Sequence, residues 1–138
     1  MSGEEREEER FGKMPPEVER AATEIVDAIF RVHTKLGPGL LESVYEQCLE
    51  YELKSRGLRV ERQVLVPVVY DELVVKDGLR IDLLVEGQII IEIKAVEKLN
   101  PVFEAQLLTY LKLSGRRLGF LVNFNVPVIR LGIKRMVL

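Results

Sequence analysis

Residues 79–94 read LRIDLLVEGQIIIEIK, and their pattern decides how the sheet of this protein is built. Every odd position in the two halves of this stretch is apolar: Leu79, Ile81, Leu83, Val85, Ile89, Ile91 and Ile93. Alternation with a period of two is typical of a β-strand with one buried face. Glu86-Gly87-Gln88 lies between the halves and fits a turn. We therefore predict a hairpin of strands 79–85 and 89–95.

The length of this turn sets the register of the hairpin, because opposed residues of an antiparallel pair share a face. A two-residue turn would place the apolar row of each strand on the same face as the polar row of the other. A three-residue loop over 86–88 places both apolar rows on one face, and a slip of one residue would scramble that face. We therefore expect Asp82 directly opposite Glu92, with their β-carbons about 4.5–5.5 Å apart, and Lys94 on the same face.

An opposed Asp–Glu pair destabilises a sheet unless something neutralises it. A divalent cation between the two carboxylates would do so. The alternative is an exposed sheet face, on which Asp82 and Glu92 are hydrated and Lys94 serves as their counter-ion. Leu84 and Ile90 share this even-numbered face, which indicates that it is partly covered and favours a functional site.

The other predicted elements surround this hairpin. Helices are predicted for residues 15–36, 40–56 and 101–114, and further strands for residues 59–70, 118–123 and 128–137. In the third helix the predicted core stripe is Val102, Ala105, Leu108 and Leu111. Asp71-Glu72 and Asp77-Gly78 are both turn signals. The order α-α-β-β-β-α-β-β predicts an α/β (α+β) fold, in which a mixed β-sheet is flanked by helices.

The charge of the chain is uneven along its length. Residues 1–10 hold five glutamates and two arginines, so the net charge of −2 for the whole chain leaves +1 on residues 11–138. We predict a disordered acidic tail over residues 1–14 and a single domain over residues 15–138. A body this close to neutral binds a polyanion only through a local basic patch or a bridging cation.

The single cysteine and the single histidine restrict the metal chemistry. Cys48 alone excludes an internal disulfide framework and a zinc site built on several thiolates. His33 alone excludes a site built on several histidines. Any metal would be bound mostly by oxygen, which points to Mg²⁺ or Mn²⁺. With a single cysteine we expect a cytoplasmic, reducing compartment. The sequence holds no uncharged run of 18 apolar residues, so we expect no membrane partner.

Asp82, followed on the next strand by Glu92-x-Lys94, resembles the PD-(D/E)XK nuclease superfamily. Ile81 stands where the name-giving proline of the superfamily would be, a position that often differs in distant members. The resemblance covers residues 16–136. It implies a restriction-endonuclease-like core.

Two further motifs narrow the resemblance. Gly39-x-x-Glu42-x-x-Tyr45 resembles the motif that names the GxxExxY family, a small-protein branch of this superfamily. Gln106 and Tyr110, four residues apart on one predicted helix, resemble the Q-x-x-x-Y motif of its exonuclease-like branch. An acid–acid–lysine set is a weak signal alone, and it becomes specific when both motifs accompany it in this order.

The resemblance implies a role for each matching position. Asp82 and Glu92 would bind Mg²⁺ or Mn²⁺, with the backbone carbonyl of Ile93 as a third ligand. Lys94 would position or help to deprotonate the attacking water, and Glu42 would add an acidic group from the second helix. The residues that would contact the substrate or brace the site are Gln106, Tyr110, His33, Tyr45 and Arg80.

We expect a metal-dependent nuclease that hydrolyses phosphodiester bonds, with DNA as the expected substrate. Such hydrolysis needs a hydroxide near neutral pH and a counter-charge for the phosphate, and an oxygen-bound cation supplies both. Two alternatives stay open: a non-catalytic nucleic-acid-binding or assembly module that keeps the fold, and a hydrolase of small phosphorylated molecules. For His33 and Tyr45 the alternative is a structural role. The expected partner is nucleic acid, and a homodimer is a further option.

Overall fold

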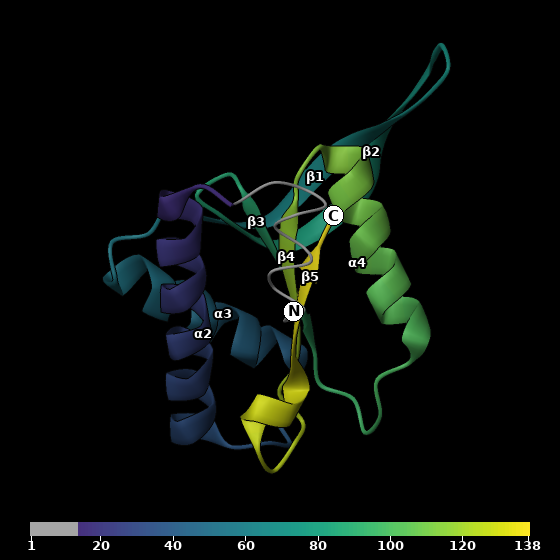
Figure 1. Ribbon diagram of the computed structural model, residues 1–138. Coiled ribbons are helices and arrows are strands. Elements are labelled where there is room, and N and C mark those ends of the chain that lie inside the picture. Colours follow the sequence, from purple (N-terminus) through teal and green to yellow (C-terminus); the bar gives the residue numbers. More distant parts are fainter. Residues whose placement is uncertain (1–13) are drawn as a thin grey trace, which may run out of the picture.

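Two helices cover one face of a five-stranded mixed sheet, and a third helix covers the other face (Figure 1). The structure is a computed structural model that describes residues 14–138. In chain order the elements are α2 (Pro16–Leu36), α3 (Glu42–Ser55), β1 (Val60–Tyr70), β2 (Leu73–Val85), β3 (Ile89–Lys94), α4 (Pro101–Ser114), β4 (Leu118–Asn123), the 3₁₀ turn η1 (Ile129–Gly132) and β5 (Ile133–Val137). The order of helices and strands confirms the predicted α/β class.

The strands lie in the order β1-β2-β3-β4-β5, so neighbours along the chain are also neighbours in the sheet. β3 and β4 are parallel, and the other three pairs are antiparallel. A parallel pair needs a crossover connection, which α4 supplies. Local signals set the ends of this helix. Asn100 caps its start by accepting a hydrogen bond from the Val102 N–H (2.9 Å), and Gly115 ends it with a left-handed φ of 70°.

β2 begins earlier than predicted, because only one of the two turn signals before residue 79 reverses the chain. Asp71-Glu72 forms the turn between β1 and β2. Asp77-Gly78 instead forms an irregularity inside β2, where Asp77 has a φ of 58°. The hairpin of β1 and β2 is therefore long, and its far end extends well beyond the rest of the sheet (Figure 1).

The predicted strand 128–137 is a strand only in its second half. Its first half is η1, in which Gly132 lies so close to β4 that a Cβ there would be 2.2 Å from the carbonyl oxygen of Asn123. The acidic tail predicted for residues 1–14 lies outside the described residues, except for Met14, which packs against the core. None of the described helices is both long and apolar enough to cross a membrane.

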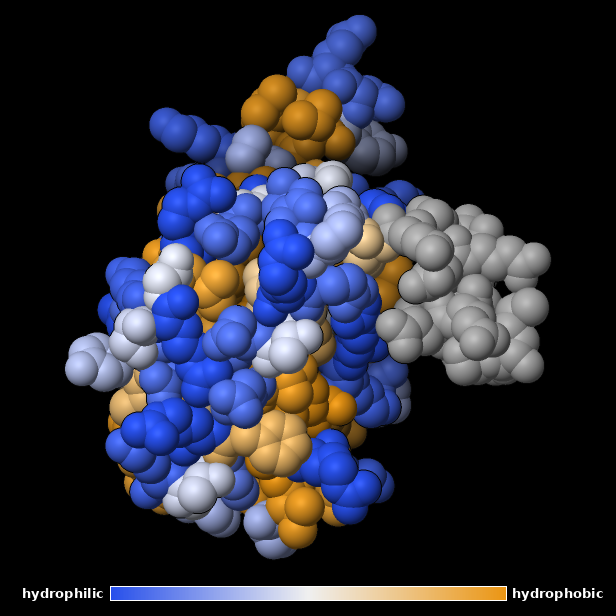
Figure 2. All heavy atoms as spheres, turned by 60° about the vertical axis from the view of Figure 1, so that its left-hand side comes forward, coloured by the Kyte–Doolittle hydropathy of each residue, from blue (hydrophilic) through white to orange (hydrophobic). Residues whose placement is uncertain are grey.

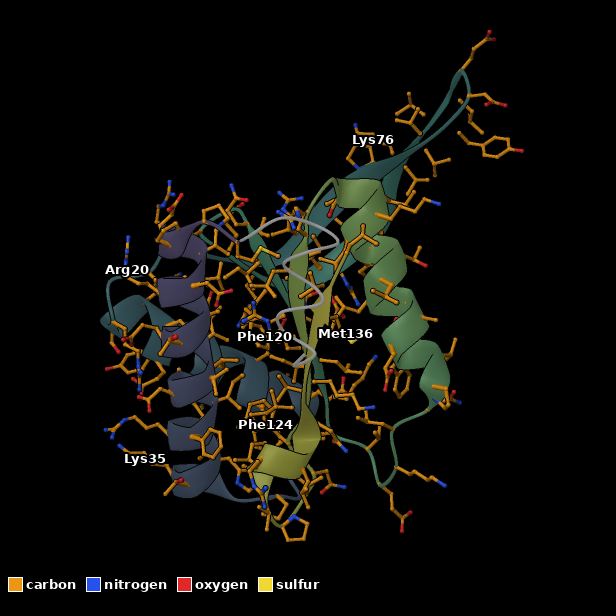
Figure 3. The ribbon with its side chains drawn as sticks, viewed as in Figure 1. Arg20, Lys35, Lys76, Phe120, Phe124 and Met136 are labelled. Carbon is orange, nitrogen blue, oxygen red and sulfur yellow. The ribbon has the colours of Figure 1, made fainter. Side chains whose placement is uncertain are left out.

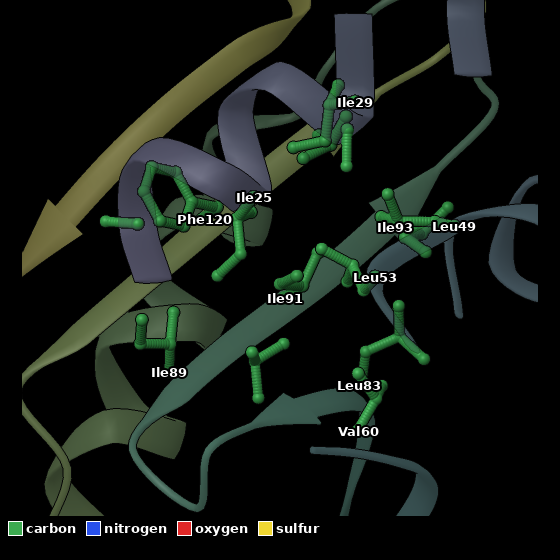
Figure 4. Close-up of a cluster of buried hydrophobic side chains, with 14 of the residues drawn as sticks. Ile25, Ile29, Leu49, Leu53, Val60, Leu83, Ile89, Ile91, Ile93 and Phe120 are labelled. Carbon is green, nitrogen blue, oxygen red and sulfur yellow. The ribbon is translucent and has the colours of Figure 1, made fainter. Parts of the chain in front are cut away.

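Each face of the sheet has its own hydrophobic core. The first core lies under α2 and α3, where Ile25 packs with Ile91 and Phe120 of the sheet (Figure 4). Figure 3 shows Phe120 between the sheet and α2. The second core lies under α4 and contains Leu107 and Leu111. The even-numbered face of the hairpin is therefore covered, as predicted from its apolar residues.

α4 is rotated relative to its predicted stripe. Val102 is 57% exposed, whereas Leu107 and Leu111 are fully buried. The rotation leaves Gln106 and Tyr110 half-buried at the border between the helix and the sheet. This position allows both polar side chains to reach the sheet face without lying in the core.

β2 and β3 have the register predicted from a three-residue loop. The observed pairs are Leu83↔Ile91, Leu84↔Ile90 and Val85↔Ile89. Asp82 and Glu92 are the next two positions in the same register. The regular pairing stops just before them, so the two strands separate where the carboxylates lie.

The odd positions of β2 do not share one face, and that part of the prediction is wrong. Ile81 belongs to the second core, whereas Leu83 belongs to the first. β1 makes the same change of side, since Val60 packs in the first core and Val64 packs against the second. Both strands therefore turn over between these positions.

This change of face lies at Gln63 and Asp82, which oppose each other in β1 and β2. The ladder pairs the residues on either side of them but skips these two. Gln63 has a left-handed φ of 56°, which is rare for a residue other than glycine, asparagine or aspartate. Its side-chain amide donates a hydrogen bond to the carboxylate of Glu46 on α3. The left-handed residue and this bond account for the turned strand.

The left-handed backbone at residue 63 predicts an unusual order of stability. Gln63→Gly should keep the free energy of unfolding within about 1 kcal/mol of wild type, because glycine adopts positive φ freely. Gln63→Val should lower it by about 1–3 kcal/mol, because a β-branched residue is strained there. Urea unfolding measures both. At Glu61, an exposed position in the regular part of β1, the order should reverse. The same order at both positions would contradict the assignment.

Candidate active site

All of the predicted site residues except His33 and Tyr45 meet at one open cavity of about 460 Å³ between the sheet and α4. Its lining includes Glu42, Arg80, Asp82, Glu92, Ile93, Lys94, Gln106 and Tyr110. Two larger cavities, of about 660 and 570 Å³, lie against α2. Neither is lined by a predicted site residue, so the chemistry of the lining, and not cavity size, identifies the candidate site.

Asp82 and Glu92 are held side by side by two reciprocal hydrogen bonds. The backbone N–H of Asp82 donates to Glu92 Oε1 (3.3 Å), and the backbone N–H of Ile93 donates to Asp82 Oδ2 (2.8 Å). Each carboxylate thus accepts a backbone N–H from the other strand, in place of the regular ladder. Glu92 is only 6% exposed. The geometry brings two carboxylates together inside the protein.

The surroundings of this pair favour the protonated form. Burial, followed by the negative charge of Asp82, raises the pKa of Glu92 to about 8. Burial also raises the pKa of Asp82, although the hydrogen bond from Ile93 and the charge of Lys94 act in the opposite direction. Without a bound cation, the pair therefore keeps a proton at neutral pH.

Glu42 reaches the cavity from the first turn of α3. Its Oε1 accepts a hydrogen bond from the backbone N–H of Ala95 (3.1 Å), directly after Lys94. Its charge contributes to the raised pKa of Asp82. The contact therefore places a third carboxylate near the pair and ties α3 to the end of β3.

Tyr45 lies outside the cavity and braces the loop before Glu42. It is fully buried, and its ring stacks on Phe124 with centroids 4.5 Å apart. Its hydroxyl donates to the Gly37 carbonyl (2.7 Å) and accepts from the Leu40 N–H (3.1 Å). Glycine, glutamate and tyrosine at this spacing thus form one unit that sets where α3 begins.

Lys94 and two residues of α4 complete the cavity. The Lys94 ammonium lies 4.3 Å from the centroid of the Phe103 ring, a cation–π contact that restricts the long side chain. The Gln106 side-chain amide donates to the hydroxyl of Tyr110 (3.1 Å). Burial, followed by the charge of Glu92, raises the pKa of Tyr110. Its phenol is therefore a hydrogen-bond donor over the physiological pH range.

The structure does not bring His33 to the cavity. This histidine is buried in α2, and its Nε2 lies 2.8 Å from the carbonyl oxygen of Val126. The bond joins α2 to the loop after β4, on the far side of the sheet from α4. These surroundings fit the alternative given above, in which His33 has a structural role.

Two residues near the site were given no role by the sequence. Glu46 is half-buried one turn after Glu42, and burial raises its pKa, with a further contribution from the charge of Asp82. The signal available in the sequence was the spacing of four residues between Glu42 and Glu46, which places both on one face of a helix. Asn123 is buried and holds the segment after Lys94, because its amide accepts from the Val96 N–H (3.1 Å) and donates to the carbonyl of the same residue (2.9 Å).

The donor atoms of the cavity fit a hard divalent cation. Asp82 and Glu92 each have a second carboxylate oxygen besides the one that accepts the backbone bond. Among residues 14–138, no three His, Cys, Asp or Glu side chains form a complete metal-binding group. Mg²⁺ typically uses one or two carboxylates and completes its shell with water and substrate oxygens. This donor set therefore fits Mg²⁺ or Mn²⁺ and leaves the predicted Ile93 carbonyl as an additional ligand.

The raised pKa of Glu92 predicts a pH dependence of the metal-free protein. Between pH 4.5 and about 8 the folded state keeps a proton on Glu92 that the unfolded chain releases. Its contribution to stability is therefore present at low pH and is lost as pH rises, by up to about 1.4 kcal/mol per pH unit. Urea unfolding of wild type and Glu92→Gln in a chelating buffer measures this. A difference between the two that does not change with pH would contradict the raised pKa.

Comparison with known proteins agrees with the geometry of the cavity. No curated protein and no solved structure matches the chain. A family model described as the PD-(D/E)XK nuclease superfamily matches residues 19–136, from the first turn of α2 to β5. The match covers β1 to β4, all of β5 but its last residue and every residue of the cavity, and the chain belongs to the PD-(D/E)XK nuclease superfamily.

Proposed function

We propose that this protein hydrolyses phosphodiester bonds of DNA in a reaction that depends on Mg²⁺ or Mn²⁺. Membership in the superfamily supports a nuclease-type function. The observation that carries the proposal is the reciprocal hydrogen bonding that holds the carboxylates of half-buried Asp82 and buried Glu92 together beside Lys94.

The energetic cost of this pair favours catalysis over a passive scaffold. Two carboxylates held together away from water lose hydration, and they repel each other when both are ionised, so apolar residues at such positions are often more stable. A module that only bound nucleic acid would gain nothing from Asp82 and Glu92 in this arrangement. A divalent cation between them would offset both the lost hydration and the repulsion.

The cavity places the residues for hydrolysis around this pair. A bound divalent cation would supply a hydroxide near neutral pH and a counter-charge for the phosphate. Asp82 and Glu92 would bind and orient it where β2 and β3 separate. Lys94, restricted by Phe103, would position the attacking water and offset negative charge on the phosphate in the transition state. Glu42 would add an acidic group from α3.

The substrate would enter between the β1–β2 hairpin and α4. Arg80 lines the cavity from β2, and Gln106 and Tyr110 line it from α4. Guanidinium, amide and phenol groups all donate hydrogen bonds to phosphate oxygens. We assign these three residues to binding and positioning of the substrate backbone.

The GxxExxY branch of the superfamily is part of the proposal. Its support is local: Tyr45 holds the loop that contains Gly39, and this loop delivers Glu42 to the backbone of Ala95. The spacing of the motif therefore has a direct structural purpose in this chain.

A non-catalytic nucleic-acid-binding module is the second candidate. It is favoured by one observation, since the described residues provide no third acidic side chain that completes a metal-binding group. The two candidates differ in their response to metal and in the effect of replacing Lys94.

Metal should stabilise the folded protein. Millimolar Mg²⁺ or Mn²⁺ should raise the melting temperature by a few degrees, because a ligand that binds only the folded state stabilises it. Asp82→Asn should raise the melting temperature without metal and remove the response, since it removes one poorly hydrated charge and one ligand. Differential scanning fluorimetry measures both. Asp77→Asn, which also lines the cavity but lies on the hairpin, is the matched control and should respond like wild type. Equal melting temperatures with and without either ion in wild type would exclude the metal site.

Cleavage should depend on Lys94. Lys94→Ala should lower the rate of metal-dependent plasmid and linear DNA cleavage by about 10²–10³, the usual loss when one preorganised charge is removed from a transition state. Its thermal response to metal should remain. Lys112→Ala, on an exposed part of α4 outside the cavity, is the control and should cleave like wild type. Binding of DNA without cleavage by wild type would favour the non-catalytic module. Undiminished cleavage by Lys94→Ala would place the activity elsewhere.

A further inference from the structure

Gln63 is a strained residue beside the candidate active site. It has a left-handed φ of 56° within β1, whereas Asp71 and Glu86, two other residues with positive φ, lie in the turns between strands. Such a backbone costs free energy and persists only where surrounding contacts impose it, which is typical of functional sites. Gln63 is opposite Asp82, and the ladder between β1 and β2 skips both residues. The strain therefore lies next to the first carboxylate of the site.

The contact that imposes this backbone comes from Glu46 on α3, which accepts a hydrogen bond from the Gln63 side-chain amide. The side of the molecule that carries α2 and α3 is largely hydrophilic (Figure 2), so an exposed glutamate would be ordinary there. Glu46 is instead half-buried. Burial raises its pKa, and the charge of Asp82 adds to this rise, which places Glu46 close to Asp82. Neither Glu46 nor Gln63 lines the cavity, so any effect on the reaction must pass through another residue.

The direction of the Asp82 side chain depends on how β1 turns over opposite it. Ile81 packs in the second core and Leu83 in the first, so Asp82 lies where β2 crosses from one face of the sheet to the other. In a regular strand Ile81 and Leu83 would share a face, and Asp82 would point to the opposite one. The left-handed Gln63 lets β1 follow this crossing. A β1 that was no longer held at Gln63 would therefore change where Asp82 presents its carboxylate.

The helix α3 supplies the fixed frame for this arrangement. Glu42, in its first turn, accepts a hydrogen bond from the Ala95 N–H at the end of β3 (3.1 Å). Glu46 lies one turn later on the same face and contacts β1. The two glutamates thus fix the end of β3 and the turned part of β1 relative to each other, and the Asp82–Glu92 pair lies between these two places.

We propose that Glu46 and Gln63 are positioning residues, whose hydrogen bond holds β1 in its turned form and so places the Asp82 carboxylate where it can bind a divalent cation together with Glu92. This inference rests on the proposed function, because the cation site is part of that function. Gln63 is exposed, so its hydrogen bond contributes little to overall stability. Groups that orient metal ligands typically change metal affinity or activity by about 10–100-fold when they are replaced.

The affinity for Mn²⁺, measured from the electron paramagnetic resonance signal of the free ion well below the melting temperature, tests this proposal. Glu46→Ala and Gln63→Gly should each raise the dissociation constant about tenfold or more. Glycine permits the left-handed backbone but cannot hold it there, so Gln63→Gly removes the contact without straining the fold. The double variant should bind no more weakly than the weaker single variant, because both substitutions remove the same contact.

Two further variants separate this contact from charge and from general damage to α3. Glu46→Gln keeps an acceptor oxygen without the charge, and it should bind Mn²⁺ like wild type. Glu50→Ala is the matched control. Glu50 is half-buried one turn later on α3, and its Oε1 lies 3.8 Å from a guanidinium nitrogen of Arg62, next to Gln63, so its replacement should leave the affinity unchanged. Equal losses in Glu46→Gln and Glu46→Ala, or a similar loss in Glu50→Ala, would overturn the proposal.

Hydrogen exchange of the metal-free protein reports the position of Asp82 without any cation. The Ile93 N–H donates to Asp82 Oδ2 (2.8 Å), so Glu46→Ala should speed its exchange about tenfold relative to the N–H of Ile91, in the regular part of β3. Unchanged exchange at Ile93, or unchanged Mn²⁺ affinity in Glu46→Ala, would overturn the positioning role and leave the proposed function standing. If wild type does not bind Mn²⁺, the proposed function fails, and the exchange of Ile93 alone supports or overturns the positioning of Asp82.

Discussion

Two backbone N–H groups hold the carboxylates of Asp82 and Glu92 together, and the rest of the site depends on this contact. The N–H of Asp82 donates to the Glu92 carboxylate, and the N–H of Ile93, the residue after Glu92, donates to the Asp82 carboxylate. The regular β2–β3 pairing ends one residue earlier, so the side chains take over hydrogen bonds that the ladder would otherwise make. A sheet that was regular at this point would have no backbone donors left for the pair. The break in the ladder is therefore what allows two carboxylates to lie side by side, one half-buried and one buried.

The same position is where β1 and β2 change faces, which connects the site to the shape of the molecule. With Gln63 left-handed opposite Asp82, neither neighbouring strand pairs regularly with the residue that carries the first carboxylate. Glu46 secures the turned strand from α3, and the same helix delivers Glu42 to the end of β3. The helix α3 thus contacts the strand on one side of the pair through Glu46 and the end of β3 through Glu42. The buried Tyr45 fixes the residue at which this helix begins.

Much of the hairpin could be predicted because strand periodicity is strict. With a period of two, only one register of β2 and β3 places their apolar residues on the same face, and the structure has this register. The change of face was not predictable, since glutamine carries no signal for a left-handed backbone and its partner Glu46 is distant in the sequence. Asp71-Glu72 and Asp77-Gly78 are equivalent turn signals in the local sequence. Only the pairing of β1 with β2 shows that the chain reverses at the first of them. A lone histidine likewise carries no sign of its surroundings, and only the structure shows that His33 contacts Val126 and lies outside the cavity.

Under the proposed function, the charge of the cavity makes metal binding a condition for substrate binding. Glu42, Asp77, Asp82 and Glu92 share the cavity with Lys94 and Arg80, so it is net negative both when all are ionised and when Glu92 holds a proton. In neither state does it attract a phosphate, and the +1 on residues 11–138 adds no long-range attraction. A divalent cation adds two positive charges and offsets this net negative charge. Because coupling between two ligands is reciprocal, a bound phosphate must then strengthen cation binding by the same factor. A site built on clustered carboxylates therefore lets a protein without a strongly basic body bind a polyanion only when the cation is present.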